Sequence, residues 1–217
     1  MADLLLTGAT GYIGSALKSH YQEKGFTVIA PTRAECDLAK TGAVTKYLAS
    51  INFEKIDYII NNAADQSVAE LKDAKPDEIN SMMQTNFNSI AEIYSYVASH
   101  PANIKSILNI SSIEALSARA GHTIYGASKA ALESLTKSSA VELKKIRTNA
   151  LRLGLISRPD IKSSWPEGVS SWIKSTPIGR MGEIADVISA ADFLLTSDWI
   201  TGEILTLDGG NSANPGW

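Results

Sequence analysis

The amino-acid sequence predicts an α/β fold: a doubly wound parallel sheet with helices on both faces, built by residues 1–217 as a single domain. The first observation is an alternation of short apolar runs with longer segments of helical character. The second is that most runs lack a polar alternation, as expected of strands buried on both faces. The third is a length of 217 residues without a Pro- or Gly-rich linker, which suits one domain. Strand, helix and strand in that order imply right-handed crossovers and a parallel sheet.

The apolar runs predict strands at residues 4–6, 27–30, 56–60, 106–110, 148–153 and 203–207. Helices are expected at residues 12–24, 43–51, 76–99, 125–145 and 184–196. Pro and Gly gather instead at residues 159–168 and 177–182, which are predicted as loops near the end of the sheet.

Composition excludes several classes of protein. The chain has 20 Lys and Arg against 23 Asp and Glu, so it lacks the basic excess that neutralises nucleic-acid phosphates. Its one cysteine, Cys36, rules out an internal disulfide framework and fits a reducing compartment. The sequence shows neither a secretory signal nor an apolar stretch of about 20 residues. We therefore expect a soluble cytoplasmic protein that binds neither nucleic acid nor a membrane and has no metal site.

A glycine-rich segment directly follows the first predicted strand. It reads Thr7-Gly8-Ala9-Thr10-Gly11-Tyr12-Ile13-Gly14. Such a turn lets the backbone approach a pyrophosphate, and the helix that follows offers free N–H groups and a partial positive charge. Strand, turn and helix in this order are the context that a dinucleotide-binding motif requires. The alternative interpretation is that the glycines only form the turn.

The end of the second predicted strand bears on the cofactor. In a dinucleotide-binding fold, an acidic residue about 20 positions past the glycines binds the adenosine ribose 2′-hydroxyl. Thr32 and Arg33 occupy that place here. An arginine can pair with a 2′-phosphate, which favours NADP over NAD. In the alternative, Arg33 is an ordinary surface residue, and the nearby Glu35 and Asp37 leave NAD open.

Tyr125 and Lys129 lie four residues apart in a predicted helix, and therefore on one face of it. A neighbouring cation stabilises a phenolate and lowers the pKa of the phenol from about 10. The pair could then exchange a proton with a substrate alcohol or carbonyl. An amphipathic helix also produces this spacing by chance, so the pair alone is a weak signal.

Polar residues close two further predicted strands. The fourth ends in Asn109-Ile110-Ser111-Ser112, and the third is followed by Asn61-Asn62-Ala63-Ala64. Ligands of parallel sheets bind beyond the carboxyl ends of the strands. Because Asn and Ser are common in turns, each motif alone is weak, but their joint position favours a binding site.

With these motifs the chain resembles the short-chain dehydrogenases/reductases, in their compact, single-domain, Rossmann-like form. The resemblance runs almost end to end and continues beyond the predicted catalytic helix into the segments 176–183, 201–202 and 208–210. Ser112 stands 13 residues before Tyr125, which matches the family's usual spacing and selects it over Ser111.

The resemblance implies a role for each catalytic position. Tyr125 would be the general acid/base, and Lys129 would lower its pKa and hold the nicotinamide ribose. Ser112 would bind the substrate oxygen by a hydrogen bond. Asn86 would position a water that links Lys129 to solvent. The implied activity is hydride transfer between a nicotinamide and the carbonyl or secondary alcohol of a small molecule.

The resemblance also implies a cofactor site. Asp37-Leu38 resembles the pair that meets the adenine ring, Asn62 and Ala63 would line the cofactor cleft, and Gly154 and Ile156 fit the nicotinamide edge. The full predicted cofactor set is Gly8, Thr10, Gly11, Tyr12, Ile13, Gly14, Thr32, Arg33, Asp37, Leu38, Asn62, Ala63, Ala64, Tyr125, Lys129, Gly154 and Ile156.

The chain departs from the family pattern in four places. The spacing of its glycines is closer to that of the sugar-nucleotide epimerases than to Gly-x-x-x-Gly-x-Gly. Only four positions separate Arg33 from the Asp37-Leu38 pair, whereas family members normally have a helix and a strand between these positions. We therefore expect one strand fewer than usual in the sheet. Leu153 replaces the proline that usually precedes Gly154. The lid at residues 157–175 is short, and its Trp165 and Trp172 are predicted to pack against the rim rather than to cap a substrate.

The sequence therefore predicts an NADP(H)-dependent oxidoreductase, with NAD as the less favoured cofactor. A sugar-nucleotide epimerase or reductase is one alternative, and a non-catalytic NADP(H)-sensing protein is another. A homodimer or homotetramer is expected from the family, with Leu135, Val141 and Leu143 as contacts unless they face the sheet. The terminal Pro215-Gly216-Trp217 would either seal a subunit contact or form a tail.

Overall fold

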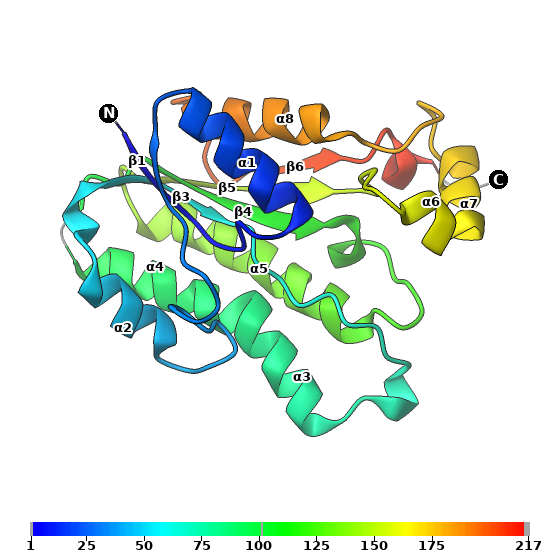
Figure 1. Ribbon diagram of the computed structural model, residues 1–217, viewed down its shortest axis with the longest axis horizontal. Coiled ribbons are helices and arrows are strands. Elements are labelled where there is room, and N and C mark those ends of the chain that lie inside the picture. Colours follow the sequence, from blue (N-terminus) through cyan, green and yellow to red (C-terminus); the bar gives the residue numbers. More distant parts are fainter. Residues whose placement is uncertain (1, 101, 215–217) are drawn as a thin grey trace.

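The computed structural model describes residues 2–100 and 102–214, which form one six-stranded sheet with every strand parallel (Figure 1). The terminal residues 215–217, for which a subunit contact was considered, lie outside this range. The strands are β1 (Asp3–Leu6), β2 (Thr27–Ile29), β3 (Ile56–Asn61), β4 (Ser106–Ser112), β5 (Arg147–Leu153) and β6 (Ile204–Leu207). The predicted doubly wound parallel sheet is confirmed, and the predicted strands differ from these by one or two residues.

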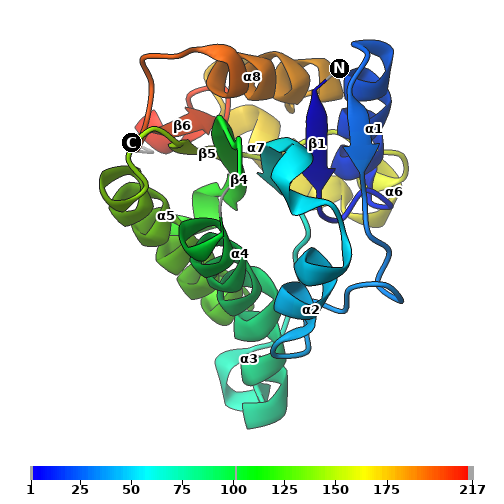
Figure 2. The same ribbon diagram turned by 90° about the vertical axis from the view of Figure 1, so that its left-hand side faces the viewer.

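Helices cover both faces of the sheet (Figures 1 and 2). On one face lie α1 (Tyr12–Glu23) and α8 (Ile184–Thr196), and on the other lie α2 (Ala43–Ser50), α4 (Ser89–Ser99) and α5 (Thr123–Glu142). Each face has its own apolar core: Leu17 and Leu194 are buried in the first, and Leu48, Ile93 and Leu132 in the second. These helices cover the two faces of the sheet and leave the carboxyl ends of its strands accessible.

The order of the strands is β2-β1-β3-β4-β5-β6, so the direction of winding changes between β1 and β3. Ligands of open α/β sheets bind at such a switch point. A third strand usually flanks the second one on its outer side. Here residues 30–42 contain no strand, and β2 is the edge. The predicted loss of one strand therefore falls on the side of the sheet that would meet the adenosine.

The seam between α1 and α8 joins the two ends of the chain. The Asp192 carboxylate on α8 accepts hydrogen bonds from His20 on α1 and from Lys24 at its C-terminal end. The pair His20 and Asp192 is separated by 172 positions in the sequence. These contacts lower the pKa of Asp192, although its partial burial opposes them. The helix after the glycine segment is thus supported by the last helix of the fold.

Two predicted segments differ from the structure. The helix expected over 76–99 is interrupted: α3 (Pro76–Met83) and α4 are joined by a π-helical turn, η3 (Gln84–Asn88). The loop expected over 159–168 instead contains α6 (Ile161–Ser164) and the start of α7 (Pro166–Ser175). Pro166 occupies the first position of α7, where its missing N–H costs nothing, so the proline begins a helix rather than a loop.

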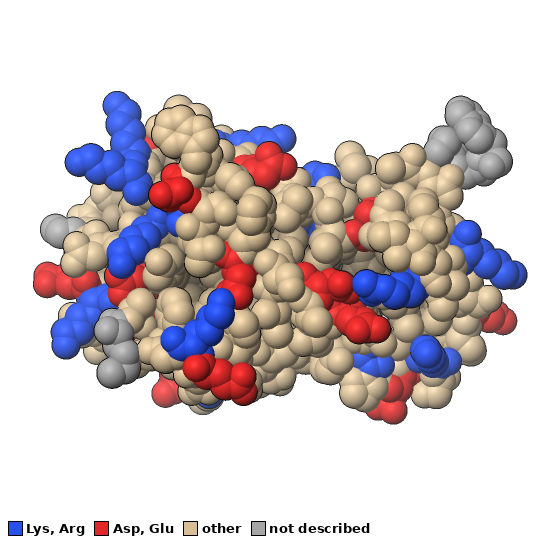
Figure 3. All heavy atoms as spheres, turned by 90° about the horizontal axis from the view of Figure 1, so that it is seen from above, with Lys and Arg blue, Asp and Glu red and all other residues tan. Residues whose placement is uncertain are grey.

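The surface carries charges of both signs. Seen from the side of α1 and α8, acidic and basic side chains are interspersed and no broad basic patch covers this face (Figure 3). Among the described helices, none combines the length and apolarity that crossing a bilayer requires.

Candidate active site

The glycine segment forms a tight turn between β1 and α1. Gly8 adopts a φ of +69°, which favours glycine, and its backbone packs against Ala63. A Cβ on Gly14 would lie 2.1 Å from the Gly8 carbonyl oxygen, so only glycine fits there. The Asn62 side chain donates to the carbonyls of Thr7 and Gly8, at 3.2 and 3.1 Å. Asn62 therefore braces the turn itself, a more specific position than the cleft wall that was predicted.

The N-terminus of α1 suits a pyrophosphate. Gly11 is the N-cap, and among the described residues no side chain caps this end and no acidic residue stands in the first turn. A Cβ on Gly11 would meet only the Gly8 carbonyl, at an ordinary 3.5 Å. The structure itself therefore does not need glycine at this position, and the free space suits a group that approaches from outside. Thr10 and Tyr12 flank this opening, whereas Ile13 packs into the core.

The chain beyond β2 forms a turn held by its own side chains. The Glu35 carboxylate accepts from the Thr32 N–H and hydroxyl, both at 2.8 Å, and these bonds lower its pKa. The Arg33 Nε lies 3.4 Å from the Asp37 carboxylate, and the Arg33 side chain is 83% exposed. Leu38 packs against the core. Arg33 is thus an exposed cation at this end of the sheet, while both nearby carboxylates have partners.

Three predicted catalytic side chains meet where β4 ends. The Tyr125 hydroxyl lies close enough to the side chains of Ser112 and Gln66 for both to influence its pKa. The Lys129 ammonium lies 5.7 Å from the centre of the Tyr125 ring and donates to the Ile110 carbonyl at 2.8 Å. Both Tyr125 and Lys129 are buried. Because α5 runs along β4, its first turns carry the phenol and the ammonium past the last residues of the strand.

Burial changes the acid–base character of this pair. The predicted lowering of the Tyr125 pKa by Lys129 is wrong for this structure. Burial raises the pKa of Tyr125 to about 12. Ser112 lowers this pKa, the nearby Glu114 carboxylate raises it and Gln66 lowers it, each with a smaller effect than burial. Burial also lowers the pKa of Lys129 to about 8, although Glu133 opposes this. Near neutral pH the phenol is therefore protonated and is a proton donor.

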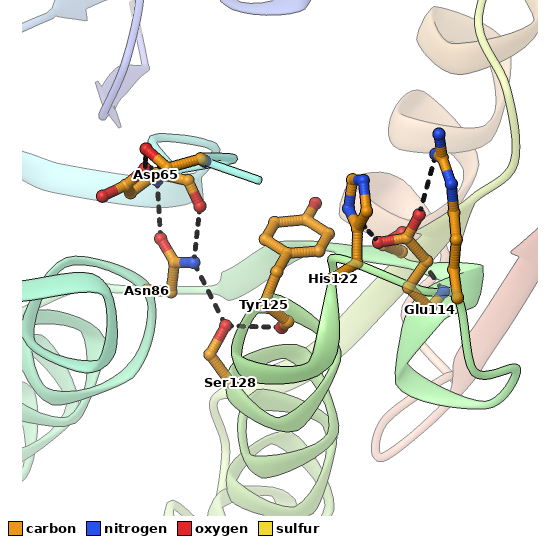
Figure 4. A network of polar contacts seen from close by, with 9 residues as sticks. Asp65, Asn86, Glu114, His122, Tyr125 and Ser128 are labelled. Atoms are coloured by element: carbon orange, nitrogen blue, oxygen red, sulfur yellow. Dashed lines mark hydrogen bonds and ion pairs between the residues drawn. The ribbon is translucent and has the colours of Figure 1, made fainter. Parts of the chain in front are cut away.

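Asn86 lies in the π-helical turn and is completely buried. Its side chain accepts from the Asp65 N–H at 2.7 Å and donates to the Asp65 carbonyl at 2.9 Å and to the Ser128 hydroxyl at 3.1 Å. Ser128 in turn donates to the Tyr125 carbonyl (Figure 4). Extra residues in a helical turn often mark functional sites. Here the turn inserts Asn86 between the segment after β3 and helix α5, which carries Tyr125 and Lys129.

A charged cluster stands beside Ser112. The Glu114 N–H donates to the Ser112 hydroxyl oxygen at 3.2 Å, which leaves the hydroxyl proton free to bond elsewhere. The Glu114 carboxylate is paired with His122, at 2.9 Å, and with Arg119 (Figure 4). The Arg119 guanidinium lies 4.4 Å from the centre of the Trp165 ring. This cluster thus connects the end of β4 with the lid.

The lid closes over the end of β5. A Cβ on Gly154 would lie 2.7 Å from the Trp172 ring, so the indole packs directly on this glycine. Ile156 forms an isolated bridge with Gly182. Trp165 and Trp172 also pack against the small core that the lid encloses. The expectation that both tryptophans pack against the rim agrees with these contacts.

The comparisons with known proteins point to one family. The family model described as Enoyl-(Acyl carrier protein) reductase matches residues 8–212. A 3-oxoacyl-[acyl-carrier-protein] reductase from Chlamydia trachomatis is 32% identical over 217 residues, which cover 96% of this chain and 87% of the relative. The chain belongs to the short-chain dehydrogenase/reductase family.

Solved structures of other proteins share the fold. ElxO with NADP bound is 25% identical, with a TM-score of 0.85 over 98% of this chain and 99% of that one. A 4-hydroxyisoleucine dehydrogenase complexed with NADH is 26% identical, with a TM-score of 0.88 over the same shares. The resemblance of this chain to the short-chain dehydrogenases/reductases therefore holds for the backbone as well as the motifs.

Sequence reasoning missed several polar residues of this short-chain dehydrogenase/reductase. Gln66, in the segment after β3, lies near enough to Tyr125 to lower its pKa, and Glu114 and His122 form the pair beside Ser112. Glu133 and Arg152 form a partly buried ion pair behind Lys129. Of these residues, only Glu133 could have been found from sequence spacing, because it lies one helical turn beyond Lys129 and so shares its helical face. The others meet through tertiary contacts that spacing does not reveal.

Proposed function

We propose that this protein is an NADP(H)-dependent oxidoreductase that transfers a hydride between its cofactor and the carbonyl or secondary alcohol of a small molecule. Residues 1–217 would form one cofactor-binding and catalytic domain. The observation that carries the proposal is the meeting of Ser112, Tyr125 and Lys129 at the end of β4, on the same edge of the sheet as the glycine turn. The names of the relatives, a reductase and a dehydrogenase among them, support it.

The residues of the chain divide the work of the reaction. When bound, the cofactor would supply the hydride to the carbonyl carbon. The Ser112 hydroxyl, held by the Glu114 N–H, would donate a hydrogen bond to the carbonyl oxygen. Tyr125 would transfer its phenolic proton to that oxygen, and the Lys129 charge one helical turn away would stabilise the phenolate that remains. Asn86 would keep α5 in register with the segment after β3.

The test of this function is the Tyr125→Phe variant. Removing the hydroxyl removes the proton donor, so turnover of a carbonyl panel with NADPH should fall by about 10²–10⁴-fold. NADPH binding, followed by fluorescence titration, should survive because the variant leaves the glycine turn intact. Turnover close to that of the wild type would contradict the mechanism. Cofactor binding without turnover of any carbonyl by the wild type would favour the sensing protein instead.

The preference for NADP is proposed from the end of β2. Arg33 is an exposed cation there. Glu35 already binds Thr32, and Asp37 pairs with Arg33 and Lys40, so neither of these two carboxylates is unpartnered. A guanidinium and a 2′-phosphate form charge-assisted hydrogen bonds. The cofactor named in the ElxO structure supports this choice, whereas the 4-hydroxyisoleucine dehydrogenase was solved with NADH.

Arg33→Ala tests the preference directly. The variant should weaken NADPH binding by about tenfold or more, because a charged hydrogen bond is lost, and leave NADH binding within about twofold. Isothermal titration with both cofactors measures this difference. Lys40→Ala, which removes another exposed cation that pairs with Asp37, is the matched control. Equal losses for the two cofactors would overturn the assignment.

Assembly and location follow the family expectation. We propose a cytoplasmic homodimer or homotetramer acting on a small molecule. Of the side chains considered as contacts, Leu135 and Leu143 pack against the core, whereas Val141 is 76% exposed on α5. Trp199, in the loop before β6, is 97% exposed. A Cβ on Gly202 would lie 3.3 Å from the Ala140 Cβ, so that loop approaches the same end of α5.

A further inference from the structure

A partly buried ion pair, with its carboxylate in the interior, lies beneath helix α5. The Glu133 carboxylate on α5 accepts from the Arg152 Nε on β5 at 2.9 Å and also from an Arg152 terminal nitrogen. The Ser111 hydroxyl on β4 donates to the same carboxylate at 2.7 Å, and Arg152 donates to Thr206 on β6 at 3.1 Å. One carboxylate thus holds α5 against β4 and β5, and Arg152 extends this hold to β6.

Glu133 and the catalytic lysine share one face of α5. They lie one helical turn apart and contact consecutive residues of β4: Lys129 donates to the Ile110 carbonyl, and Glu133 accepts from the Ser111 hydroxyl. The next residue of the strand is Ser112. The face of α5 that carries Tyr125 and Lys129 is therefore fixed to the last three residues of β4, with Glu133 at its inner end.

The surroundings of Lys129 leave its charge with little support. Its ammonium is almost completely buried, and burial disfavours a charge. Among the described residues, Glu133 is the charged group whose field favours the protonated form. The titratable and charged groups on the elements around Lys129 are Tyr125 and Glu133 on α5, Glu114 after β4, Arg152 on β5, Asp65 after β3 and Asp208 after β6.

We propose that Glu133, clamped by Arg152 and Ser111, is a positioning residue that keeps Lys129 charged and in place beside Tyr125. This inference rests on the proposed function for its catalytic meaning. The carboxylate itself touches neither Tyr125 nor a substrate and acts through the lysine. Without its charge, the buried ammonium loses its proton at a lower pH, and the phenolate that forms at Tyr125 loses its neighbouring cation.

The direct test is a titration of Lys129 in the folded protein. The chain is labelled with ¹³C-lysine, the Lys129 signal is assigned with Lys129→Arg, and its Cε shift is followed by NMR between pH 6 and 11. The double variant Glu133→Gln with Arg152→Met removes both charges and so leaves no buried charge unpaired. Its Lys129 midpoint should lie about one pH unit below that of the wild type. An unchanged midpoint overturns the inference.

A second variant protects the test against misfolding. Glu133→Gln alone keeps the Arg152 charge near the lysine, and its Lys129 midpoint should fall further than in the double variant. The matched control is Thr136→Val, which removes a buried hydrogen bond with Asn109 from the same seam between α5 and β4 without altering a charge. Its Lys129 midpoint should remain that of the wild type. A shift as large in the control would assign the effect to packing and overturn the role of Glu133.

The pH profile of turnover supplies the catalytic readout. If reaction needs a protonated Lys129, the alkaline limb of kcat/KM should move about one pH unit lower in the double variant and stay in place in Thr136→Val. A limb that does not move although the Lys129 midpoint does overturns the catalytic part of the proposal. If the wild type turns over no carbonyl compound, the proposed function fails, and the NMR titration still decides whether Glu133 sets the charge of Lys129.

Discussion

Gly11 and Gly14 stand three residues apart in one turn, but they are glycine for different physical reasons. A Cβ on Gly14 collides with the chain itself, at 2.1 Å from the Gly8 carbonyl oxygen and 2.7 Å from the Asn62 amide nitrogen. A Cβ on Gly11 meets nothing closer than 3.5 Å. The fold itself requires glycine at position 14. Gly11 instead leaves room beside the free N–H groups at the start of α1.

This contrast predicts opposite effects of two alanine variants. Gly14→Ala should lower the free energy of unfolding by about 1–3 kcal/mol, because the methyl group forces apart a packed turn. The free energy of unfolding of Gly11→Ala should stay within about 0.5 kcal/mol of the wild-type value. This variant should nevertheless bind NADPH at least tenfold more weakly, because its methyl group occupies the space beside the free N–H groups. Urea unfolding and NADPH titration of both variants measure the two effects. Normal NADPH binding by Gly11→Ala would show that the pyrophosphate does not bind at this turn.

Residues were predictable where sequence spacing fixes their geometry. Tyr125 and Lys129 share a helical face, and the resemblance to the family selects Ser112 by its spacing of 13 residues from Tyr125, so three partners could be named from the sequence. The direction of the Tyr125 pKa shift could not be predicted, because it depends mainly on burial, which the local sequence does not reveal. Gln66 and Arg152 were missed because each reaches the site from a different strand or loop.

At the scale of elements, the strands were predicted within one or two residues because parallel strands buried on both faces form unbroken apolar runs. The π-helical turn between α3 and α4 was not predicted. Its five residues, Gln84–Asn88, continue the helical pattern, and the insertion becomes visible only through the bonds of Asn86 with Asp65 and Ser128. The lid helices were hidden by Pro166, which looked like a loop marker and begins a helix instead.

The seam between α1 and α8 makes a pH-dependent contribution to stability. Because the pKa of Asp192 is lower in the folded chain, its ionised form stabilises the fold above the unfolded pKa of about 3.9. That stabilisation is lost as the pH falls through the folded pKa. Asp192→Asn should cost about 0.5–1 kcal/mol at pH 7, a small value because solvent screens the partly exposed pair.

Thermal unfolding at several pH values checks this contribution of Asp192. The difference in stability between the wild type and Asp192→Asn should shrink as the pH is lowered from 5 toward 2.5. Asp37→Asn, at the other edge of the sheet, is a control that leaves the seam intact. A difference that stays constant down to pH 2.5 would show that the carboxylate charge does not hold these helices.

For the whole molecule, the exposed apolar side chains at the end of α5 bear on assembly. Val141 and Trp199 are strongly exposed, and large apolar side chains exposed to water often belong to an interface. We expect Val141→Lys to raise the monomer fraction in sedimentation velocity runs at micromolar concentration. Val68→Lys, at an exposed apolar position after β3, should leave the distribution unchanged. Identical sedimentation of all three proteins would place any subunit contact elsewhere.

The support that α8 gives to α1 has a consequence for biosynthesis. The helix that presents the N-terminal turn is bonded through His20 to Asp192, 172 positions later, so its final contacts form only after most of the chain has left the ribosome. Parallel sheets with such distant pairings fold slowly, because the entropy of closing the long loops is lost before the non-local contacts can form and stabilise the fold. The helix after the glycine turn, although made early, therefore gains these contacts only once α8 has been made, and a chain truncated before α8 would lack them.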